Sequence, residues 1–322
     1  MRDLPKKPVK LFIPSNCMEM MRQGIKHQLV VSREVRGQNS HYKGKEVNLK
    51  HVRPWRNFVT WEELSKFLAR NPILEKALNR LLTDEEKSQF CTNPNQGRLF
   101  NETDLDGAWR ANVHTRLNLI FRLCAHDLKL DCYPELSGGA DATWISSDAE
   151  PGSQGKKPDF SGSEHDAADP DFPNRKPEAK FNRIPGECKM SGKFGSRFIP
   201  PNGDLYIQRT GLTEARKVLS QIHCYMDRSE ARYGYIVTDE ELIFLRRRGA
   251  GWGQLDVSRP IPHDGTDKDP LNSLYVMFYM HWKYARDNES WRLRSFGKFT
   301  RNRMKRAAGK RTDKLPKECK IC

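Results

Sequence analysis

The chain has 322 residues, and a hydrophobic share of 37% with seven Trp and fifteen Phe excludes a wholly unfolded polymer. A formal net charge of +15 favours a polyanionic partner, nucleic acid first among them. No apolar run approaches the length that spans a bilayer, so we expect no membrane partner. The first residues carry charge without an extended apolar segment, so we expect no secretion signal.

The eight cysteines are scattered along the chain and lie mostly in apolar segments. This distribution predicts reduced thiols in an intracellular protein. The one closely spaced pair, Cys319 and Cys322, lacks the second pair that a zinc site would need.

Residues 1–58 are basic and irregular, with strand-like runs at 10–14 and 28–35. Three helix starts follow, two of them marked by capping boxes and one by an Asn-Pro pair: Thr60–Glu63, Asn71–Pro72 and Thr83–Glu86. We therefore predict that residues 1–97 form an accessory region that is partly helical.

A long amphipathic helix is expected over 101–128, because apolar residues recur there at spacings of three and four. The residues of this face are Leu105, Trp109, Val113, Leu117, Ile120, Phe121 and Cys124. Candidate strands follow at 129–136 and 141–147, and then a polar segment at 148–179 that we expect to be a loop.

The second half of the chain predicts strands and helices in alternation. We expect a strand over 179–190, a loop over 191–211, a helix over 213–227, two strands within 232–248 and a helix over 272–287. The helix over 213–227 has an apolar face made of Ala215, Val218, Leu219, Ile222 and Met226. Helices and strands in this order predict an α/β layered fold.

The C-terminal segment 298–322 holds ten Lys or Arg against two acids, a net +8 of the chain's +15. Such a run is typical of a disordered arm that contacts phosphate as a diffuse cation, or of a nuclear-import signal. We therefore expect a basic tail over 291–322 and favour a nuclear over a cytoplasmic location.

Glu187 and Lys189 lie two residues apart in the predicted strand, so their side chains point to the same side, with Cys188 facing the core behind them. Alone, the two could form a simple surface ion pair. Asp159, which follows Pro158 and is expected at the end of a preceding strand, adds a second carboxylate. Two carboxylates beside a lysine suit a hard divalent cation, with room for water and phosphate oxygens.

Gln221 and Tyr225 are four residues apart on the predicted helix 213–227, so one lies above the other at the edge of its apolar face. Such a position suits side chains that line a cleft. A border tyrosine with a solvated glutamine is the plainer alternative.

Taken in order, Pro158-Asp159, Glu187-Cys188-Lys189 and Gln221-x-x-x-Tyr225 resemble the PD-(D/E)XK nuclease superfamily. The Q-x-x-x-Y element resembles its RecB-like exonuclease branch, and the run at 233–247 is similar to the same domain in predicted fungal proteins. The resemblance covers about residues 100–290 and implies a restriction-endonuclease-like core, helix–strand–strand–strand–helix–strand, with a mixed central sheet flanked by helices. The implied domain spans 98–290, with an acidic insertion at 161–179.

The resemblance also implies the site residues. Asp159 and Glu187 would hold Mg²⁺ or Mn²⁺ with the main-chain carbonyl of Cys188, and Lys189 would orient the attacking water and stabilise the developing charge. Gln221 and Tyr225 would support the site or touch the DNA backbone.

Two positions and the function stay open. Glu102 is either a further catalytic and metal-binding acid or a helix-start acid favoured by the macrodipole, and Asp171, in a second Pro-Asp-Phe run, is a rival to Asp159. The function predicted is a metal-dependent nuclease, with DNA favoured over RNA as partner and a homodimer possible. The alternatives are a catalytically inactive module that binds nucleic acid or protein and retains the nuclease fold, and an interaction scaffold whose basic tail only directs nuclear import.

Overall fold

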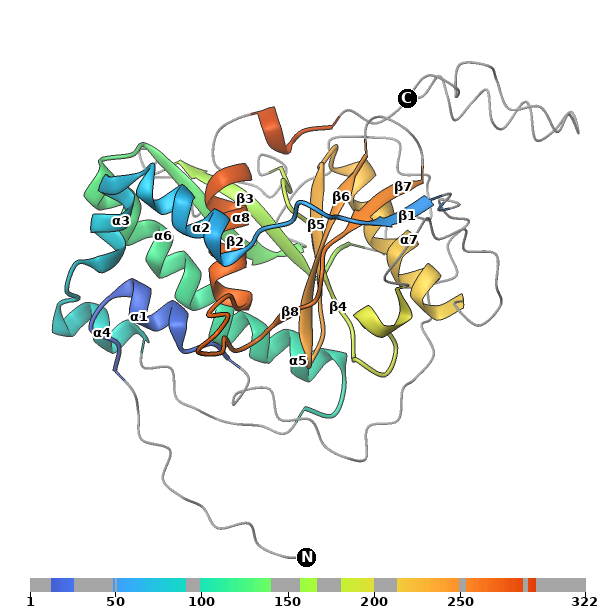
Figure 1. The fold of residues 1–322 in the computed structure, drawn as a ribbon, viewed down its shortest axis with the longest axis horizontal. Coiled ribbons are helices and arrows are strands. Elements are labelled where there is room, and N and C mark those ends of the chain that lie inside the picture. The colour runs from blue at the N-terminus through green and yellow to red at the C-terminus, as the bar shows by residue number, and fades with distance from the viewer. Residues whose placement is uncertain are drawn as a thin grey trace, which may run out of the picture.

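A computed structural model describes residues 13–25, 49, 51–90, 99–139, 157–166, 181–199, 213–248, 253–285 and 289–293. The described helices and strands are α1 Cys17–Arg22, β1 His51–Pro54, α2 Trp61–Ala69, α3 Pro72–Asn79, α4 Asp84–Phe90, α5 Glu102–Trp109, α6 Thr115–Leu128, β2 Cys132–Gly138, β3 Phe160–Asp166, β4 Gly186–Cys188, α7 Thr213–Arg228, β5 Tyr233–Val237, β6 Glu241–Arg247, β7 Gln254–Val257, β8 Ile261–Pro262 and α8 Ser273–Tyr284 (Figure 1). A π-helical turn, Arg110–His114, joins α5 to α6.

The described strands form one open mixed sheet in the order β1-β7-β6-β5-β4-β3-β2, with β8 paired to β6. Neighbouring strands are antiparallel except for two parallel pairs, β1 with β7 and β4 with β5. Strands β2, β3 and β4 therefore form an antiparallel meander, and α7 connects β4 to the parallel strand β5. The α/β class with a mixed central sheet is confirmed.

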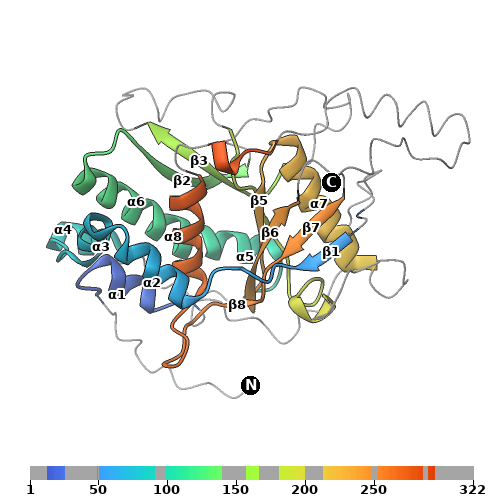
Figure 2. The same ribbon diagram turned by 45° about the horizontal axis from the view of Figure 1, so that its top comes forward.

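Helices cover both faces of the sheet (Figures 1 and 2). Successive residues of β5 point to opposite sides, so Tyr235 and Val237 join the core under α5, α6 and α8, while Ile236 joins the core under α7. The side chains of β6 alternate in the same way: Phe244 joins the core under α5, α6 and α8, and Leu245 joins the core under α7.

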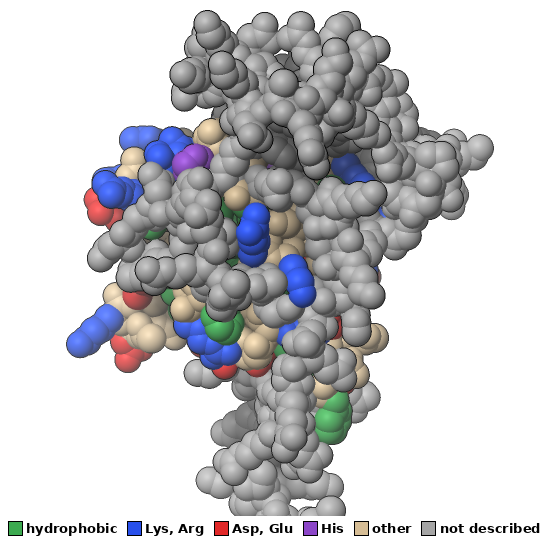
Figure 3. All heavy atoms as spheres, turned by 90° about the vertical axis from the view of Figure 1, so that its right-hand side faces the viewer, with side chains coloured by type: hydrophobic (Ala, Val, Ile, Leu, Met, Phe, Trp, Pro, Cys, Tyr) green, Lys and Arg blue, Asp and Glu red, His purple; other side chains and the backbone are tan. Residues whose placement is uncertain are grey.

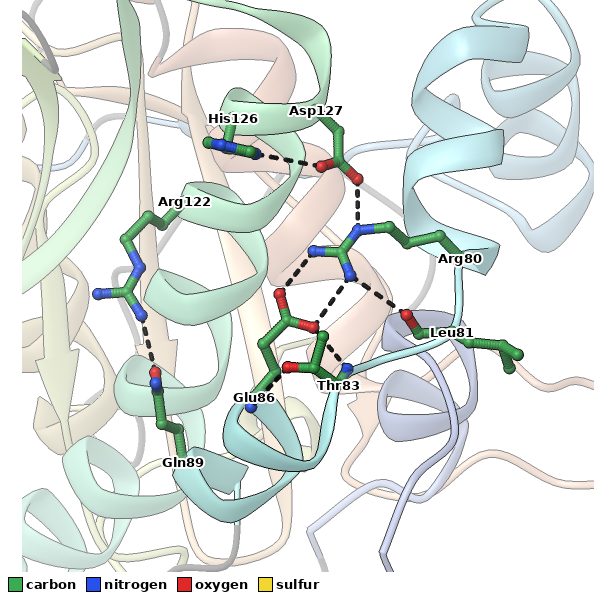
Figure 4. Close-up of polar contacts among 8 residues, drawn as sticks. All are labelled: Arg80, Leu81, Thr83, Glu86, Gln89, Arg122, His126 and Asp127. Carbon is green, nitrogen blue, oxygen red and sulfur yellow. Dashed lines mark hydrogen bonds and ion pairs between the residues drawn. The ribbon is translucent and has the colours of Figure 1, made fainter.

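Helices α1 to α3 pack into the same hydrophobic cluster as α6 and α8. An ion-pair network holds α3, α4 and α6 together (Figure 4). Arg80 donates to both carboxylate oxygens of Glu86, at 2.9 and 2.7 Å, and to Oδ2 of Asp127 at 2.5 Å. Glu86 also accepts from the main-chain N–H of Thr83 at 2.8 Å, and its own N–H donates back to Thr83 Oγ1, so the second predicted capping box is formed.

Most of the predicted helices are confirmed. The first capping box, at Thr60, opens α2, and every residue predicted for the apolar faces of 101–128 and 213–227 is buried. The long helix differs in one respect, because the N–H of Thr115 bonds to the carbonyl of Arg110, five residues back, and makes the π turn. The two predicted strands within 232–248 are β5 and β6.

Several expectations are wrong in part. The loop expected over 148–179, and the insertion expected over 161–179, overlap β3, all seven residues of which pair with β2. The strand expected over 179–190 is only β4, whose three residues pair with β5 and one of which pairs with β3. Within 191–211, Ser196–Phe198 is a 3-10 turn, and an unexpected helix, α1, lies within the irregular N-terminal region.

The candidate strands at 28–35 and 141–147, and the tail 298–322, lie outside the described residues. Of the run at 10–14, only Ile13 and Pro14 are described, and neither is in a strand. None of the helices within the described ranges is long and apolar enough to cross a membrane.

Candidate active site

Asp159 lies directly before β3, so it precedes a strand and does not end one as expected. Hydrogen bonds hold both its backbone and its side chain. Its Oδ2 accepts the main-chain N–H of Cys188 at 2.8 Å, and its carbonyl accepts from Gly139 N at 3.0 Å and from Arg110 Nη2 at 2.6 Å. Burial raises the pKa of Asp159, which the charge of Lys189 and the Cys188 N–H partly offset. Among the described residues, no hydrogen bond to its Oδ1 is formed, so one oxygen is left for a further ligand.

Glu187 is the middle residue of β4, and its side chain is 2% exposed. Oε1 accepts from Lys189 Nζ and from Gln221 Nε2, both at 2.5 Å. Oε2 is buried and accepts no hydrogen bond within the described part of the chain. Burial raises the pKa of Glu187 to about 8, against the opposing charge of Lys189. A second positive charge at Oε2 would therefore stabilise the ionised form.

The glycine before Glu187 explains how this strand is oriented. A Cβ atom at Gly186 would lie 2.2 Å from Cζ of Tyr235, so only glycine leaves space for that ring on the α5 side. Gly186 and Cys188 therefore face the core under α5, and Glu187 points to the α7 side.

Lys189 follows β4, and its ammonium touches three of the predicted metal donors. Nζ lies 2.5 Å from Glu187 Oε1, 2.9 Å from the carbonyl oxygen of Cys188 and 3.7 Å from Glu102 Oε2. Burial acts to lower the pKa of Lys189, but the neighbouring carboxylates, Glu187 first among them, outweigh burial and raise it. The lysine is therefore charged and provides the positive charge at this place.

Glu102 is the first residue of α5, whose N-terminal end packs against β4. Asn101 provides the helix cap by accepting the N–H of Asp104, so Glu102 is not needed as a cap. The Glu102 carboxylate instead contacts two ammonium groups. Its Oε1 lies 2.8 Å from Lys193 Nζ, and its Oε2 lies 3.7 Å from Lys189 Nζ.

Gln221 and Tyr225 lie on α7 and are buried, which places the predicted pair beside Glu187. Gln221 Nε2 donates to Glu187 Oε1 at 2.5 Å and to the Tyr225 hydroxyl at 2.9 Å. The amide thus fixes the direction of the Glu187 carboxylate. Contact with Tyr225 in turn fixes the amide.

The acidic turn between β5 and β6 holds the segment that carries Lys189 and Lys193. Asp239 accepts from Ser191 N at 2.6 Å and from Ser191 Oγ at 2.9 Å, and Glu241 accepts from the backbone and hydroxyl of Ser196. The residues after β4 are therefore anchored to the sheet rather than left as a free loop.

Comparison of the chain with family models, curated proteins and solved structures gave no significant match.

The structure thus brings together all six of the predicted site residues, Glu102, Asp159, Glu187, Lys189, Gln221 and Tyr225, either directly or through a shared partner. Across the described ranges, no three His, Cys, Asp or Glu side chains are grouped closely enough to hold a metal ion. The Lys189 ammonium contacts both Glu187 and Glu102. The predicted metal donors are carboxylate and carbonyl oxygens, which are the ligand types that a hard divalent cation prefers.

Asp171, the rival to Asp159, lies outside the described residues. Among the histidines, His114 and His223 are buried and His126 is exposed beside Asp127.

Sequence reasoning missed Lys193 and Arg110. Lys193 lies in the turn after β4 with no motif to mark it, and Arg110 reaches Asp159 across 49 residues of chain. The only available signal for Arg110 was Asp106, four residues earlier on the expected helix, a spacing that favours an ion pair.

Proposed function

We propose that the chain is a Mg²⁺- or Mn²⁺-dependent nuclease that hydrolyses phosphodiester bonds of nucleic acid, with DNA favoured over RNA. The observation that carries the proposal is Glu187 Oε2, a buried carboxylate oxygen without a partner in the described part of the chain. An unpaired buried carboxylate is costly, and a divalent cation beside it removes that cost.

The order of the elements supports the proposal. Helices α5 and α6, which the π turn joins, are followed by strands β2, β3 and β4, helix α7 and strand β5, the order of the helix–strand–strand–strand–helix–strand core of the resembling superfamily. In this order Asp159 precedes the second strand of the meander, Glu187 and Lys189 lie at the third, and Gln221 lies on the following helix.

Asp159, Glu187 and the carbonyl of Cys188 would hold the cation, with Glu102 as a further donor. The bound cation would supply a nucleophilic hydroxide and neutralise charge on the phosphate. Lys189, charged and anchored at Glu187, would stabilise the negative charge that develops on the phosphate oxygens. Gln221 would keep the Glu187 carboxylate in one orientation through its hydrogen bond.

The overall charge supports a nucleic acid as substrate, since +15 at neutral pH attracts phosphate from long range. On the face that carries β1, β7 and α7, Lys and Arg side chains are visible on the surface (Figure 3). Charge does not distinguish DNA from RNA.

The test is cleavage of end-labelled single-stranded and double-stranded DNA and RNA with Mg²⁺, Mn²⁺ or EDTA. We expect cleavage with either metal, none with EDTA, and none by Glu187→Gln, which preserves shape and removes the charge. Glu164→Gln is the matched control, because Glu164 is a strand glutamate paired with Arg183. Preparations of all three proteins by one route exclude a contaminating nuclease as the source of activity.

A wild-type protein that binds nucleic acid but never cuts any of these substrates contradicts the proposal. The inactive nucleic-acid-binding module would then replace it. A protein that neither binds nor cuts would favour the scaffold.

A further inference from the structure

Arg110 connects the first helix of the candidate site to the backbone of Asp159. Its Nε lies 2.9 and 3.0 Å from the two carboxylate oxygens of Asp106, and its Nη2 donates to the Asp159 carbonyl at 2.6 Å. The guanidinium carbon lies 5.3 Å from the ring centroid of Phe160, the next residue. One side chain thus makes three directed contacts, two of them with the segment that presents Asp159.

The contact matters because Asp159 lies directly before β3, outside the strand, so contacts with other elements hold its backbone. The carboxylate reaches the Cys188 N–H only if the backbone at Asp159 lies at the correct distance from β4. Strand β3 pairs with β4 at Phe160 and Gly186, and further backbone hydrogen bonds join Gly162 to Arg183 and Ile184, farther from Asp159. On the Asp159 side, the pairing of β3 with β4 therefore ends at Phe160. At Asp159 itself, the carbonyl accepts hydrogen bonds from Arg110, the first residue of the π turn, and from Gly139, directly after β2.

The backbone of Arg110 is itself unusual. It is the first residue of the π turn, and its carbonyl accepts both the N–H and, at 3.2 Å, the hydroxyl of Thr115. A π turn inserts an extra residue and changes the direction of the side chains that follow. Arg110 lies where α5 ends and this turn begins, and its side chain reaches the Asp159 carbonyl directly before β3.

We propose that Arg110 is a positioning residue that, together with Asp106, holds the Asp159 backbone so that its carboxylate faces Cys188 and the metal donors. Arginine suits this task, because its planar guanidinium donates in two directions at once. Lysine has a single nitrogen and reaches only one of the two partners with the same geometry. The part of this inference that concerns metal donors rests on the proposed function. The position of Asp159 can be measured in the protein without any metal.

The first measurement is amide hydrogen exchange at Cys188 in the metal-free protein. Arg110→Lys is expected to accelerate exchange at this amide by about tenfold, because the hydrogen bond to a charged acceptor is weakened. The amide of Lys189, which donates to Val237 instead, reports whether β4 as a whole has loosened. Unchanged exchange at Cys188, or equal acceleration at both amides, overturns the inference.

The second measurement is calorimetric titration with Mn²⁺. Loss of a residue that orients a metal ligand typically costs about 10–100-fold in affinity, so Arg110→Lys is expected to raise the dissociation constant by about tenfold. Asp106→Asn, which removes the charge that steadies Arg110, should act in the same direction and serves if Arg110→Lys folds poorly. Arg122→Lys on α6 is the matched control, because Arg122 contacts Gln89 far from Asp159.

The two measurements separate the inference from the proposed function. Faster exchange at Cys188 in a protein that binds no Mn²⁺ supports the positioning role and contradicts the metal site. Tight Mn²⁺ binding by wild type, with an unchanged dissociation constant and unchanged exchange in Arg110→Lys, contradicts the positioning role alone.

Discussion

The carboxylate of Asp159 accepts the main-chain N–H of Cys188 at 2.8 Å and so ties together two segments 29 residues apart. The next N–H, that of Lys189, points the other way and donates to Val237 of β5. The pairing of β3 with β4 does not extend to Cys188, so the Asp159 side chain provides the acceptor that a neighbouring strand would otherwise provide for the Cys188 N–H. The same residue has a structural role through Oδ2, while Oδ1 accepts no hydrogen bond from the described residues.

Two substitutions at Asp159 should separate these roles. Asp159→Asn keeps an oxygen that accepts from Cys188 but removes the charge, so we expect an intact fold and loss of Mn²⁺ binding and cleavage. Asp159→Ala also leaves a buried N–H without an acceptor, so it should be less stable than Asp159→Asn by about 1–3 kcal/mol. Urea unfolding and calorimetry measure the two effects. Equal stability of the two variants would contradict the structural role.

Lys189→Gln should lose cleavage and gain metal affinity. The ammonium contacts Glu187 Oε1 and the Cys188 carbonyl, so a cation in the site is repelled by it. Two unit charges 4 Å apart repel by ~1 kcal/mol even in water, so we expect Mn²⁺ to bind roughly fivefold tighter or more. Cleavage should fall by about 100-fold or more, as for loss of a group that stabilises the transition state.

The matched control is Lys283→Gln on α8, whose ammonium donates to the Tyr279 hydroxyl at 2.6 Å and has no part in the site. It should change neither Mn²⁺ affinity nor cleavage. Weaker Mn²⁺ binding by Lys189→Gln would mean that the lysine supports the metal donors instead of competing with the cation.

The network around Glu86 predicts a pH-dependent stability (Figure 4). Hydrogen bonds from Arg80, and then from the Thr83 backbone, lower the pKa of Glu86 from 4.5 to about 2. An acid with a lowered pKa in the folded state contributes stability above its unfolded pKa and loses it as the pH falls. Glu86→Gln should therefore be less stable than wild type at pH 7, by about 1 kcal/mol for a partly exposed pair.

The difference in stability between wild type and Glu86→Gln should shrink as the pH falls from 4.5 toward 2, because Glu86 then becomes protonated in the folded as well as the unfolded state. The neighbouring Glu85 is exposed, so Glu85→Gln is the matched control and should follow wild type at every pH. Thermal unfolding of the three proteins over pH 2–7 provides the comparison. A gap between Glu86→Gln and wild type that stays constant over this range would contradict the assignment.

The helices could be predicted because their apolar periodicity is a local property of the sequence. The faces of α6 and α7 are buried as expected, and the capping boxes at Thr60 and Thr83 are formed. The site residues could be grouped because Glu187 and Lys189 are close in sequence and Gln221 and Tyr225 are one helical turn apart.

Strand β3 could not be predicted, because its residues Phe-Ser-Gly-Ser-Glu-His-Asp have little strand propensity. Seven consecutive pairs with β2 form the strand, which shows tertiary pairing overriding local preference. Arg110 and Lys193 were missed for a related reason. Their partners Asp159 and Glu102 lie 49 and 91 residues away, and no local pattern records such contacts.

The last prediction concerns the basic segment 298–322 and separates affinity from chemistry. Its ten Lys or Arg against two acids can neutralise phosphates without regard to base sequence. Each phosphate neutralised on duplex DNA adds about 0.9 to the slope of log affinity against log salt concentration. A protein that ends at residue 297 should therefore bind DNA more weakly at low salt and with a flatter slope.

The turnover of bound DNA should hardly change, because Asp159, Glu187 and Lys189 all precede the deleted segment and their described contacts do not involve it. Binding titrations from 50 to 200 mM salt, run with Ca²⁺ in place of the active metal, measure the slope, and single-turnover cleavage with saturating enzyme measures the chemistry. A truncated protein with an unchanged salt slope would show that the tail does not contact phosphate. Normal binding with lost cleavage would place the tail in the chemical step, and the separation of charge from catalysis would be wrong.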